Sequence, residues 1–307
     1  MADGTYLLGL DIGGTKCAAL LGDADGNVLA RREWPSLVQR GAAAMLQDLL
    51  REARSLIADR RVRGVGVSIG GPMDAGRGIV LGPPNLPGWD HVPLKEILER
   101  ELGVPARVEH DAAACALAEY RWGAGRGAKR LIYLTCGTGF GAGFVFDGRV
   151  YRGAGGLNVE LGHMRIAPDG PEAFGKRGCA EALCSGQALG RIAAWQFAAR
   201  WGTAAPASPE IAALAAQGDR DAQEVIRLNA ASVGGVCAIL GDMLRPDVIA
   251  LGSLAQYLGE PWLEGVRAAF CAEALPASIE VCRIVPAGLG KRLQDLSALV
   301  VACAEEA

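Results

Sequence analysis

The stretch YLLGLDIGGTKCAALL, residues Tyr6–Leu21, decides the fold. An apolar run ends at Asp11, meets Gly13 and Gly14, and is followed by a second apolar run. A turn at Asp25-Gly26 then leads into a third run. Connections this short join antiparallel strands, because a parallel crossover needs a dozen or more residues. The stretch therefore predicts an antiparallel meander whose first turn is a glycine loop.

The same order of features occurs again in the middle of the chain. Residues 131–151 read LIYLTCGTGFGAGFVFDGRVY, with a glycine loop at Gly137–Gly139 and a turn at Asp147-Gly148. Glycines let a backbone approach an anion closely, and the backbone N–H groups of such a loop can bind phosphate. A strand follows each loop, which excludes a P-loop and a dinucleotide fingerprint, since both need a helix there. The repeat predicts two related domains that grip one phosphate chain.

Composition limits the classes of protein to which the chain can belong. It has 307 residues, of which 50% are hydrophobic, and a net charge of −3 without a notable basic run. We therefore expect two globular domains and no nucleic acid or membrane surface as partner. No apolar run approaches the roughly 20 residues of a membrane span, and the start at Met1 has no basic leader. Nine cysteines without a disulfide pattern indicate a cytoplasmic protein.

Between and after the two meanders, helices alternate with strands. The sequence predicts strands at 62–69, 106–109 and 248–251, and helices at 42–58, 93–102, 112–120, 185–201, 209–217, 222–244 and 293–304. This order is mixed α/β. We expect an N-terminal domain of residues 1–121, joined by the C-terminal helix of residues 291–307, and a larger domain of residues 122–290. The glycine-rich segment Gly123–Lys129 is the candidate hinge.

An alanine-rich helix begins at Asp111, and this residue could have either of two roles. It can cap the helix, which is a common role of aspartate. It can also act as a general base, since a helix N-terminus keeps a carboxylate ionised and able to take a proton from an attacking hydroxyl. Asp11, at the end of the first strand, is placed to hold the water shell of Mg²⁺.

Several polar residues could bind vicinal hydroxyls. Glu160 and His163 flank a glycine, and each can accept or donate a hydrogen bond. Glu181 and the amide of Asn85 extend the set. The alternative for these residues is structural: a surface carboxylate, a packed imidazole and an Asx turn.

Together these segments resemble the ROK family of sugar kinases and repressors, within the actin-like and hexokinase-like ATPases. The similarity runs from Leu8 to about Gly252. It rests on motifs that occur in the family's order: Asp11–Lys16, Gly71-Pro72, Pro84–Trp89, the Asp111 helix, Gly137–Gly141, Glu160–His163 and Gly178–Glu181. The resemblance implies two RNase H-like domains with a cleft between them, each with a mixed sheet opened by the meander.

The resemblance also implies roles for individual residues. Asp111 would be the catalytic base for a sugar 6-hydroxyl. The acceptor would bind Gly71, Asn85, His110, Asp111, Glu160, His163 and Glu181. ATP with Mg²⁺ would bind Asp11, Gly13, Gly14, Thr15, Lys16, Gly137, Thr138, Gly139, Gly252 and Ser253. Family members usually form homodimers.

The chain departs from the family pattern in its zinc segment. The family usually has Cys-x-Cys-Gly-x-x-Gly-Cys after the histidine, whereas Pro171–Cys179 is one residue shorter and keeps only the last cysteine. His163 and Cys179 supply two of the four ligands that a structural zinc needs, and Cys184 could supply a third. We expect no zinc, so packing must hold the loop that carries His163 and Glu181.

A second departure concerns the acceptor. His110 stands where the family usually has asparagine, and an imidazole is bulkier and can carry charge. The resemblance implies a hexose, with glucose first, as the acceptor. His110 puts glucose specificity in doubt, and the alternatives are an amino sugar (3-amino-3-deoxyglucose, that is kanosamine, glucosamine or N-acetylmannosamine) or a C7 cyclitol.

Two other classes of function compete. Family repressors carry a helix-turn-helix before the first glycine loop, and here only about ten residues precede Asp11. A filament-forming or chaperone-like ATPase of the same superfamily would not need the hydroxyl-binding set from Glu160 to Glu181. We therefore expect a kinase.

Overall fold

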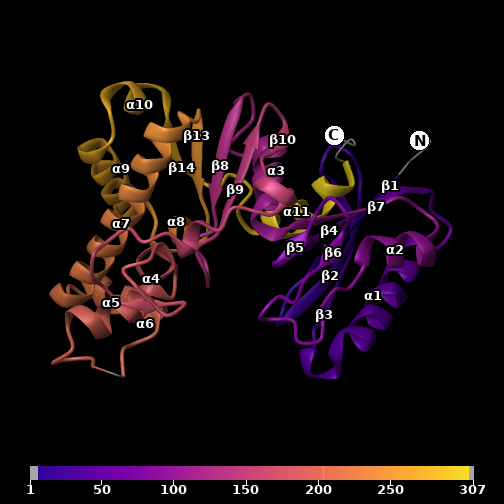
Figure 1. Cartoon of the computed structure of the whole chain (residues 1–307), viewed down its shortest axis with the longest axis horizontal. Helices are drawn as coiled ribbons and strands as arrows, with labels where there is room; N and C mark the ends of the chain where they lie inside the picture. The colour runs from indigo at the N-terminus through magenta and orange to yellow at the C-terminus, as the bar shows by residue number, and fades with distance from the viewer. Residues whose placement is uncertain (1–5, 203, 304–307) are drawn as a thin grey trace. The chain divides into compact units, whose positions relative to one another are not determined.

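The fold is a mixed α/β structure with two five-stranded sheets, as expected from the sequence. The computed structural model describes residues 6–202 and 204–303 (Figure 1). By its internal contacts the chain divides into two compact units. The first unit extends to Arg126 and includes Gly143–Asn158 and the segment from Leu289 onward; the second contains Gly127–Ala142 and Val159–Gly288.

The sheet of the first unit has the order β3-β2-β1-β4-β7. Its strands are β1 (Tyr6–Ile12), β2 (Lys16–Gly22), β3 (Val28–Pro35), β4 (Val62–Ile69) and β7 (Ala106–His110). The first three form the predicted antiparallel meander, and β4 and β7 run parallel to β1. Nearly every residue of β1, β2 and β4 is buried, as in sheets covered on both faces.

Helices cover both faces of this sheet. They are α1 (Gly41–Ile57), α2 (Leu94–Leu102), α3 (Asp111–Trp122) and α11 (Leu293–Cys303), together with the 3-10 turns η1 (Val38–Arg40) and η4 (Gly290–Arg292). Leu8 and Leu10 pack in one core with residues of α1, on the face where Figure 1 shows α1 and α2. Successive strand residues point to opposite faces, so Gly9 faces α11 instead. A Cβ on Gly66 of β4 would lie 2.2 Å from the Ala302 nitrogen, so α11 approaches the sheet closely only because that position is glycine.

The segment Gly143–Asn158 groups with the first unit although it follows the start of the second. It contains most of β9 (Ala142–Phe146), all of β10 (Arg149–Val150) and the turn η2 (Ala154–Gly156). A Cβ on Gly143 would lie 2.2 Å from the Ala112 carbonyl oxygen, so β9 packs directly on α3. This division differs from the expected domain bounds of 1–121 and 122–290, which stay a prediction. Residues 304–307 of the expected C-terminal segment lie outside the described residues, as does the start of the chain.

The second sheet has the order β10-β9-β8-β13-β14. The strands β8 (Arg130–Leu134), β13 (Val248–Leu251) and β14 (Arg283–Pro286) are parallel. The helices of the second unit are α4 (Ala180–Cys184), α5 (Ala188–Gln196), α6 (Ser208–Ala216), α7 (Arg220–Leu244), α8 (Ser253–Leu258), α9 (Glu260–Glu273) and α10 (Pro276–Val281). Two short hairpins are β5 (Met73–Asp74) with β6 (Ile79–Val80), and β11 (Glu172–Ala173) with β12 (Lys176–Arg177).

One helical expectation needs correction. Within the stretch 185–201 the α-helix α5 covers only Ala188–Gln196, and the preceding helix α4 ends at Cys184. The Ser185 hydroxyl accepts a hydrogen bond from the Ala188 amide, which satisfies one of the unpaired N–H groups at the start of α5. The side chain of Ser185 thus separates two short helices.

Among the described helices, α7 alone is long and apolar enough to cross a membrane by length and composition. It is a central helix of the second unit and packs against α4, α5, α6 and α9. The buried Asn229 amide on α7 donates to the Leu183 carbonyl and accepts from the Trp262 indole. These contacts are those of a core helix.

Candidate active site

The carboxyl ends of three parallel strands meet at one edge of the first sheet. In the register, Asp11 of β1 lies beside Ser68 of β4, and Ile69 of β4 lies beside His110 of β7. Asp11, the Gly70-Gly71 turn and the His110-Asp111 step therefore share this edge. In α/β sheets, ligands bind at the carboxyl ends of the strands. This edge is the first part of the candidate site.

The first glycine loop forms the tight hairpin that the sequence predicts. The Gly13 amide donates to the Lys16 carbonyl, and the Ser36 hydroxyl donates to the Gly13 carbonyl. A Cβ on Gly14 would lie 2.8 Å from the Asn85 carbonyl oxygen. The loop that carries Asn85 thus packs against the glycine loop, which brings two of the predicted site residues into contact.

Asp11 is buried in an acidic surrounding. Burial, with smaller contributions from the charges of Asp111 and Asp295, raises the pKa of Asp11 to about 7. No ion pair among residues 6–202 and 204–303 includes Asp11. A buried carboxylate beside other carboxylates is stabilised in its charged form by a cation, so the site fits a bound Mg²⁺ with its water shell.

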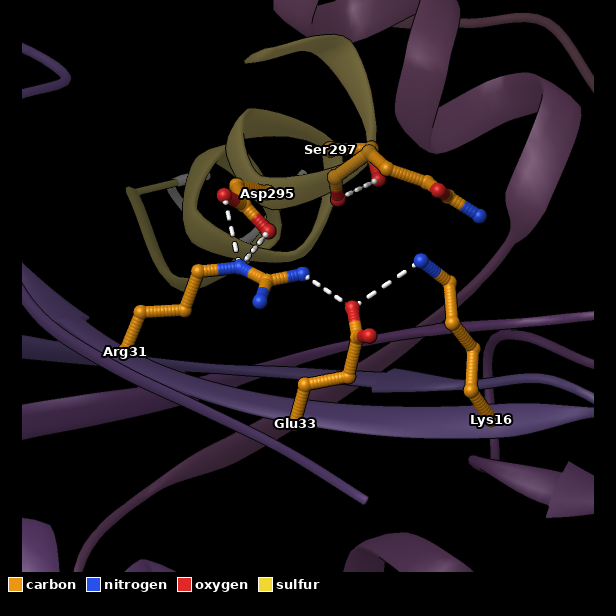
Figure 2. Close-up of polar contacts among 6 residues, drawn as sticks. Lys16, Arg31, Glu33, Asp295 and Ser297 are labelled. Atoms are coloured by element: carbon orange, nitrogen blue, oxygen red, sulfur yellow. Dashed lines mark hydrogen bonds and ion pairs between the residues drawn. The ribbon is translucent and has the colours of Figure 1, made fainter. Parts of the chain in front are cut away.

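The two cations near Asp11 are held by other carboxylates. The Lys16 ammonium lies 2.9 Å from Glu33, and Arg31 lies 2.6 Å from Glu33 and 2.8 Å from Asp295 of α11. Figure 2 shows Glu33 between Arg31 and Lys16, with Asp295 on the far side of the guanidinium. Lys16, predicted to contact the nucleotide, is therefore paired with Glu33 here.

Asp111 is the first residue of α3, and its side chain is 55% exposed. Its Oδ1 accepts a 2.6 Å hydrogen bond from the Ala112 amide, and the His110 Nδ1 lies 3.3 Å from the same oxygen. Oδ2 lies 4.0 Å from the place of a Cβ on Gly70 and accepts no hydrogen bond from the described residues. One oxygen is thus held by the helix, and the other is open to accept a proton from a bound hydroxyl.

The His110 ring is mostly buried and packs against Gly71. A Cβ on Gly71 would lie 2.8 Å from the His110 Cδ2. This contact brings together two more of the predicted acceptor residues.

The sequence did not indicate the partners of Glu109, which lies on the strand before Asp111. Glu109 is buried with 4% exposure, and its Oε1 accepts a 3.0 Å hydrogen bond from the His110 amide. Its Oε2 pairs with the guanidinium of Arg152. Burial raises the pKa of Glu109, and the Arg152 charge opposes that change. An acidic residue within a predicted strand was the available signal, but its partner lies 43 residues away.

The second glycine loop lies in the other unit, at the carboxyl ends of β8 and β13. The Gly137 amide donates to the Gly139 carbonyl, and a Cβ on Gly137 would lie 3.3 Å from the Ser253 hydroxyl. The Gly252 amide donates to the Leu134 carbonyl. Gly252 and Ser253 therefore adjoin the loop. Thr138, at its tip, is exposed.

Glu181 connects this loop to the predicted acceptor residues. Its Oε2 accepts a 2.6 Å hydrogen bond from the Phe140 amide. The same oxygen lies 3.3 Å from the place of a Cβ on Gly139 and 3.4 Å from one on Gly162, in the turn η3 (Leu161–His163). Glu160 precedes that turn, and its carbonyl accepts from the His163 amide. Glu160, His163 and Glu181 are thus brought together in the second unit.

Packing and hydrogen bonds surround the segment where the family's zinc would lie. The Cys179 thiol is buried and donates to the Ala173 carbonyl. Burial raises the pKa of the Cys184 thiol well above its usual value. The part of the chain that the structure describes contains no group of three or more His, Cys, Asp or Glu side chains placed to hold a metal ion.

Comparison with known proteins gives a family and several relatives. The model of the ROK family matches residues 7–293. The chain is 33% identical to a glucokinase of Streptomyces coelicolor over 78% of the chain and 73% of that protein. It is also 33% identical to an N-acetylmannosamine kinase of Salmonella heidelberg, over 88% of the chain and 89% of that protein.

Solved structures agree with these matches. A ROK hexokinase from Thermus thermophilus superposes with a TM-score of 0.85 at 33% identity, covering 97% of this chain and 98% of that one. A ROK family glucokinase from Streptomyces griseus, solved with glucose and AMPPNP, gives a TM-score of 0.78 at 32% identity, with 97% and 99% covered.

Proposed function

The chain belongs to the ROK family, and we propose that it is a sugar kinase that uses ATP to phosphorylate the 6-hydroxyl of a hexose, with Asp111 as general base. Glucose is the first candidate acceptor. The single observation that carries the proposal is the state of Asp111. One of its oxygens is fixed by the Ala112 amide, while the other accepts no hydrogen bond from the described residues.

The reaction needs a base because the attacking oxygen is a hydroxyl. Asp111 lies at the N-terminus of α3, where the positive end of the helix dipole favours a negative charge. As the hydroxyl oxygen bonds to the γ-phosphorus and ADP leaves, its proton passes to Asp111 Oδ2. The His110 Nδ1 lies 3.3 Å from the other oxygen of Asp111 and makes no hydrogen bond with the described residues.

We propose that the two glycine loops bind the phosphates of ATP. The Gly13 and Gly137 amides bond within their own loops, so the amides of Gly14, Thr15, Thr138 and Gly139 would bind the phosphate oxygens. Gly252 and Ser253 adjoin the second loop. Asp11 would hold Mg²⁺ through water, and the bound metal would neutralise charge on the transferred phosphoryl group.

The residues that we propose to bind the acceptor are Asn85, Gly71 and His110 of the first unit and Glu160, His163 and Glu181 of the second. The relatives include kinases named for glucose and for N-acetylmannosamine at the same 33% identity. An amino sugar or a C7 cyclitol is therefore the alternative acceptor, because His110 beside Asp111 replaces the asparagine that the family usually has there.

We also propose that the enzyme acts in the cytoplasm as a homodimer. All nine cysteines are free thiols, as expected in a reducing compartment. Sedimentation of the purified protein tests the dimer, and a single species of monomer mass would contradict it.

ADP release measured with a coupled assay tests the function. The panel should contain glucose, mannose, fructose, glucosamine, N-acetylmannosamine, 3-amino-3-deoxyglucose and a C7 cyclitol. We expect turnover with at least one acceptor, and a loss of about 10²–10⁴-fold in Asp111→Asn. Glu210→Gln is the control, since Glu210 is an exposed acid in the first turn of α6. Near-normal activity of Asp111→Asn would refute the assigned base.

A further inference from the structure

We propose that Phe174 is a positioning residue that fixes the orientation of the His163 imidazole toward the acceptor. The proposal rests on the function above, in which His163 contacts a sugar hydroxyl. A neutral imidazole has one N–H donor and one acceptor nitrogen, both in the ring plane. The orientation of that plane therefore decides which hydroxyl the ring can reach.

The hairpin β11–β12 holds His163 at two points. The rings of Phe174 and His163 stack with their centroids 3.9 Å apart and their planes at 11°. The Lys176 ammonium donates a 2.7 Å hydrogen bond to the His163 carbonyl. One short hairpin thus contacts both the side chain and the backbone of the same residue.

Two features of Phe174 are unfavourable for the hairpin itself. The side chain is 58% exposed, and its backbone has a φ of 56°, in the left-handed region. Gly175 follows with a φ of 64°. A two-residue turn with two positive φ values favours Asn-Gly, and a bulky residue at the first position is sterically strained. The ring contact with His163 explains why an exposed aromatic side chain stands at this position.

The hairpin is anchored to the rest of the second unit. Ala173 packs with Cys179 and Ala182, and the Cys179 thiol donates to the Ala173 carbonyl. Cys179 leads directly into α4, where Glu181 accepts from the Phe140 amide of the second glycine loop. A continuous set of contacts therefore joins the phosphate loop, Glu181, the hairpin and His163.

Substitutions of Phe174 separate positioning from stability. Phe174→Asn creates the preferred Asn-Gly turn, so we expect an unchanged or higher melting temperature. The loss of stacking should raise the KM for the acceptor about three- to tenfold and leave the KM for ATP unchanged. Phe174→Tyr keeps the ring and should restore the wild-type KM. An unchanged acceptor KM in Phe174→Asn would overturn the proposal, as would a KM that rises equally in Phe174→Tyr.

A second measurement does not depend on activity. The chain has only three histidines, so His163→Gln identifies the His163 Hε1 resonance in a proton–carbon NMR spectrum. We expect that resonance to move downfield in Phe174→Asn and to stay near its wild-type position in Phe174→Tyr, because a stacked ring shields it. No shift would refute the positioning of His163. If the expected shift occurs but the wild-type protein phosphorylates nothing on the acceptor panel, the proposed function fails and the ring contact stands.

Discussion

Arg152 forms an ion pair with the buried Glu109, whose other carboxylate oxygen accepts a hydrogen bond from the His110 amide. The pair joins the segment after β10 to the end of β7. The residue after His110 is Asp111, so the pair supports the backbone that carries the proposed base.

Replacement of Arg152 by methionine should leave the Glu109 charge buried without its partner. We expect a loss of about 2–4 kcal/mol in the free energy of unfolding, less than for a fully buried pair because Arg152 is partly exposed. Urea denaturation measures the loss. Glu109→Gln in the same background should recover part of it, because the amide oxygen still accepts from the His110 amide.

The control for that prediction is Arg227→Met. Arg227 and Glu224 form an exposed i,i+3 pair on α7, which should contribute less than about 1 kcal/mol. Equal effects of Arg152→Met and Arg227→Met would contradict the structural role of the Glu109 pair.

Asp11 should make the stability of the nucleotide-free protein depend on pH. The pKa of Asp11 is raised from 3.8 to about 7 in the folded state, so between these values the folded protein binds a proton that the unfolded chain releases. The contribution of Asp11 to the free energy of unfolding is therefore largest below about pH 4, decreases as pH rises and becomes constant above about pH 7. The total decrease is up to about 4 kcal/mol.

The measurement compares urea unfolding of the wild type and Asp11→Asn at pH 5 and at pH 8. Between pH 5 and pH 8 the wild type should lose more unfolding free energy than Asp11→Asn, since asparagine does not ionise. Parallel pH profiles for the two proteins would show that Asp11 does not titrate in this range.

Gly14→Ala should damage binding at the first glycine loop. The added Cβ would lie 2.8 Å from the Asn85 carbonyl oxygen, so either the loop or the Asn85 segment must move. We expect a loss of about tenfold or more in kcat/KM, since small displacements of binding groups are costly in catalysis. Gly235→Ala is the matched control, because Gly235 lies within α7 and its Cβ would meet no atom within 4 Å. An effect in both variants, or in neither, would contradict the steric argument.

Activity should not depend on zinc. Cys179 donates to a carbonyl and His163 stacks on Phe174, so contacts within the chain hold the segment that family members stabilise with metal. Treatment with a zinc-selective chelator, followed by assay with excess Mg²⁺, should leave the rate unchanged, whereas omission of Mg²⁺ should abolish it. One equivalent of bound zinc in the purified protein would show the prediction wrong.

Local features of this protein could be predicted from the sequence because adjacent residues determine them. Gly13 and Gly14 between two apolar runs specify a hairpin, and the repeat at Gly137–Gly139 specifies another; both are present. Asp111 before an alanine-rich stretch specifies a helix start, which is also present. Backbone sterics and hydrogen bonds within a few residues are sufficient for each of these outcomes.

Contacts between distant residues were decided only by the tertiary structure. Nothing near Glu109 in the sequence indicates Arg152, and nothing near His163 specifies stacking on Phe174. The expected C-terminal helix packs on the first sheet, but the close approach of α11 to Gly66 could not be read from the sequence. Such pairs form because the whole chain buries apolar surface and pairs its buried charges together, a balance that no short segment contains. The sequence alone determined two glycine loops and a helix that begins with an aspartate; packing decided which side chains support them.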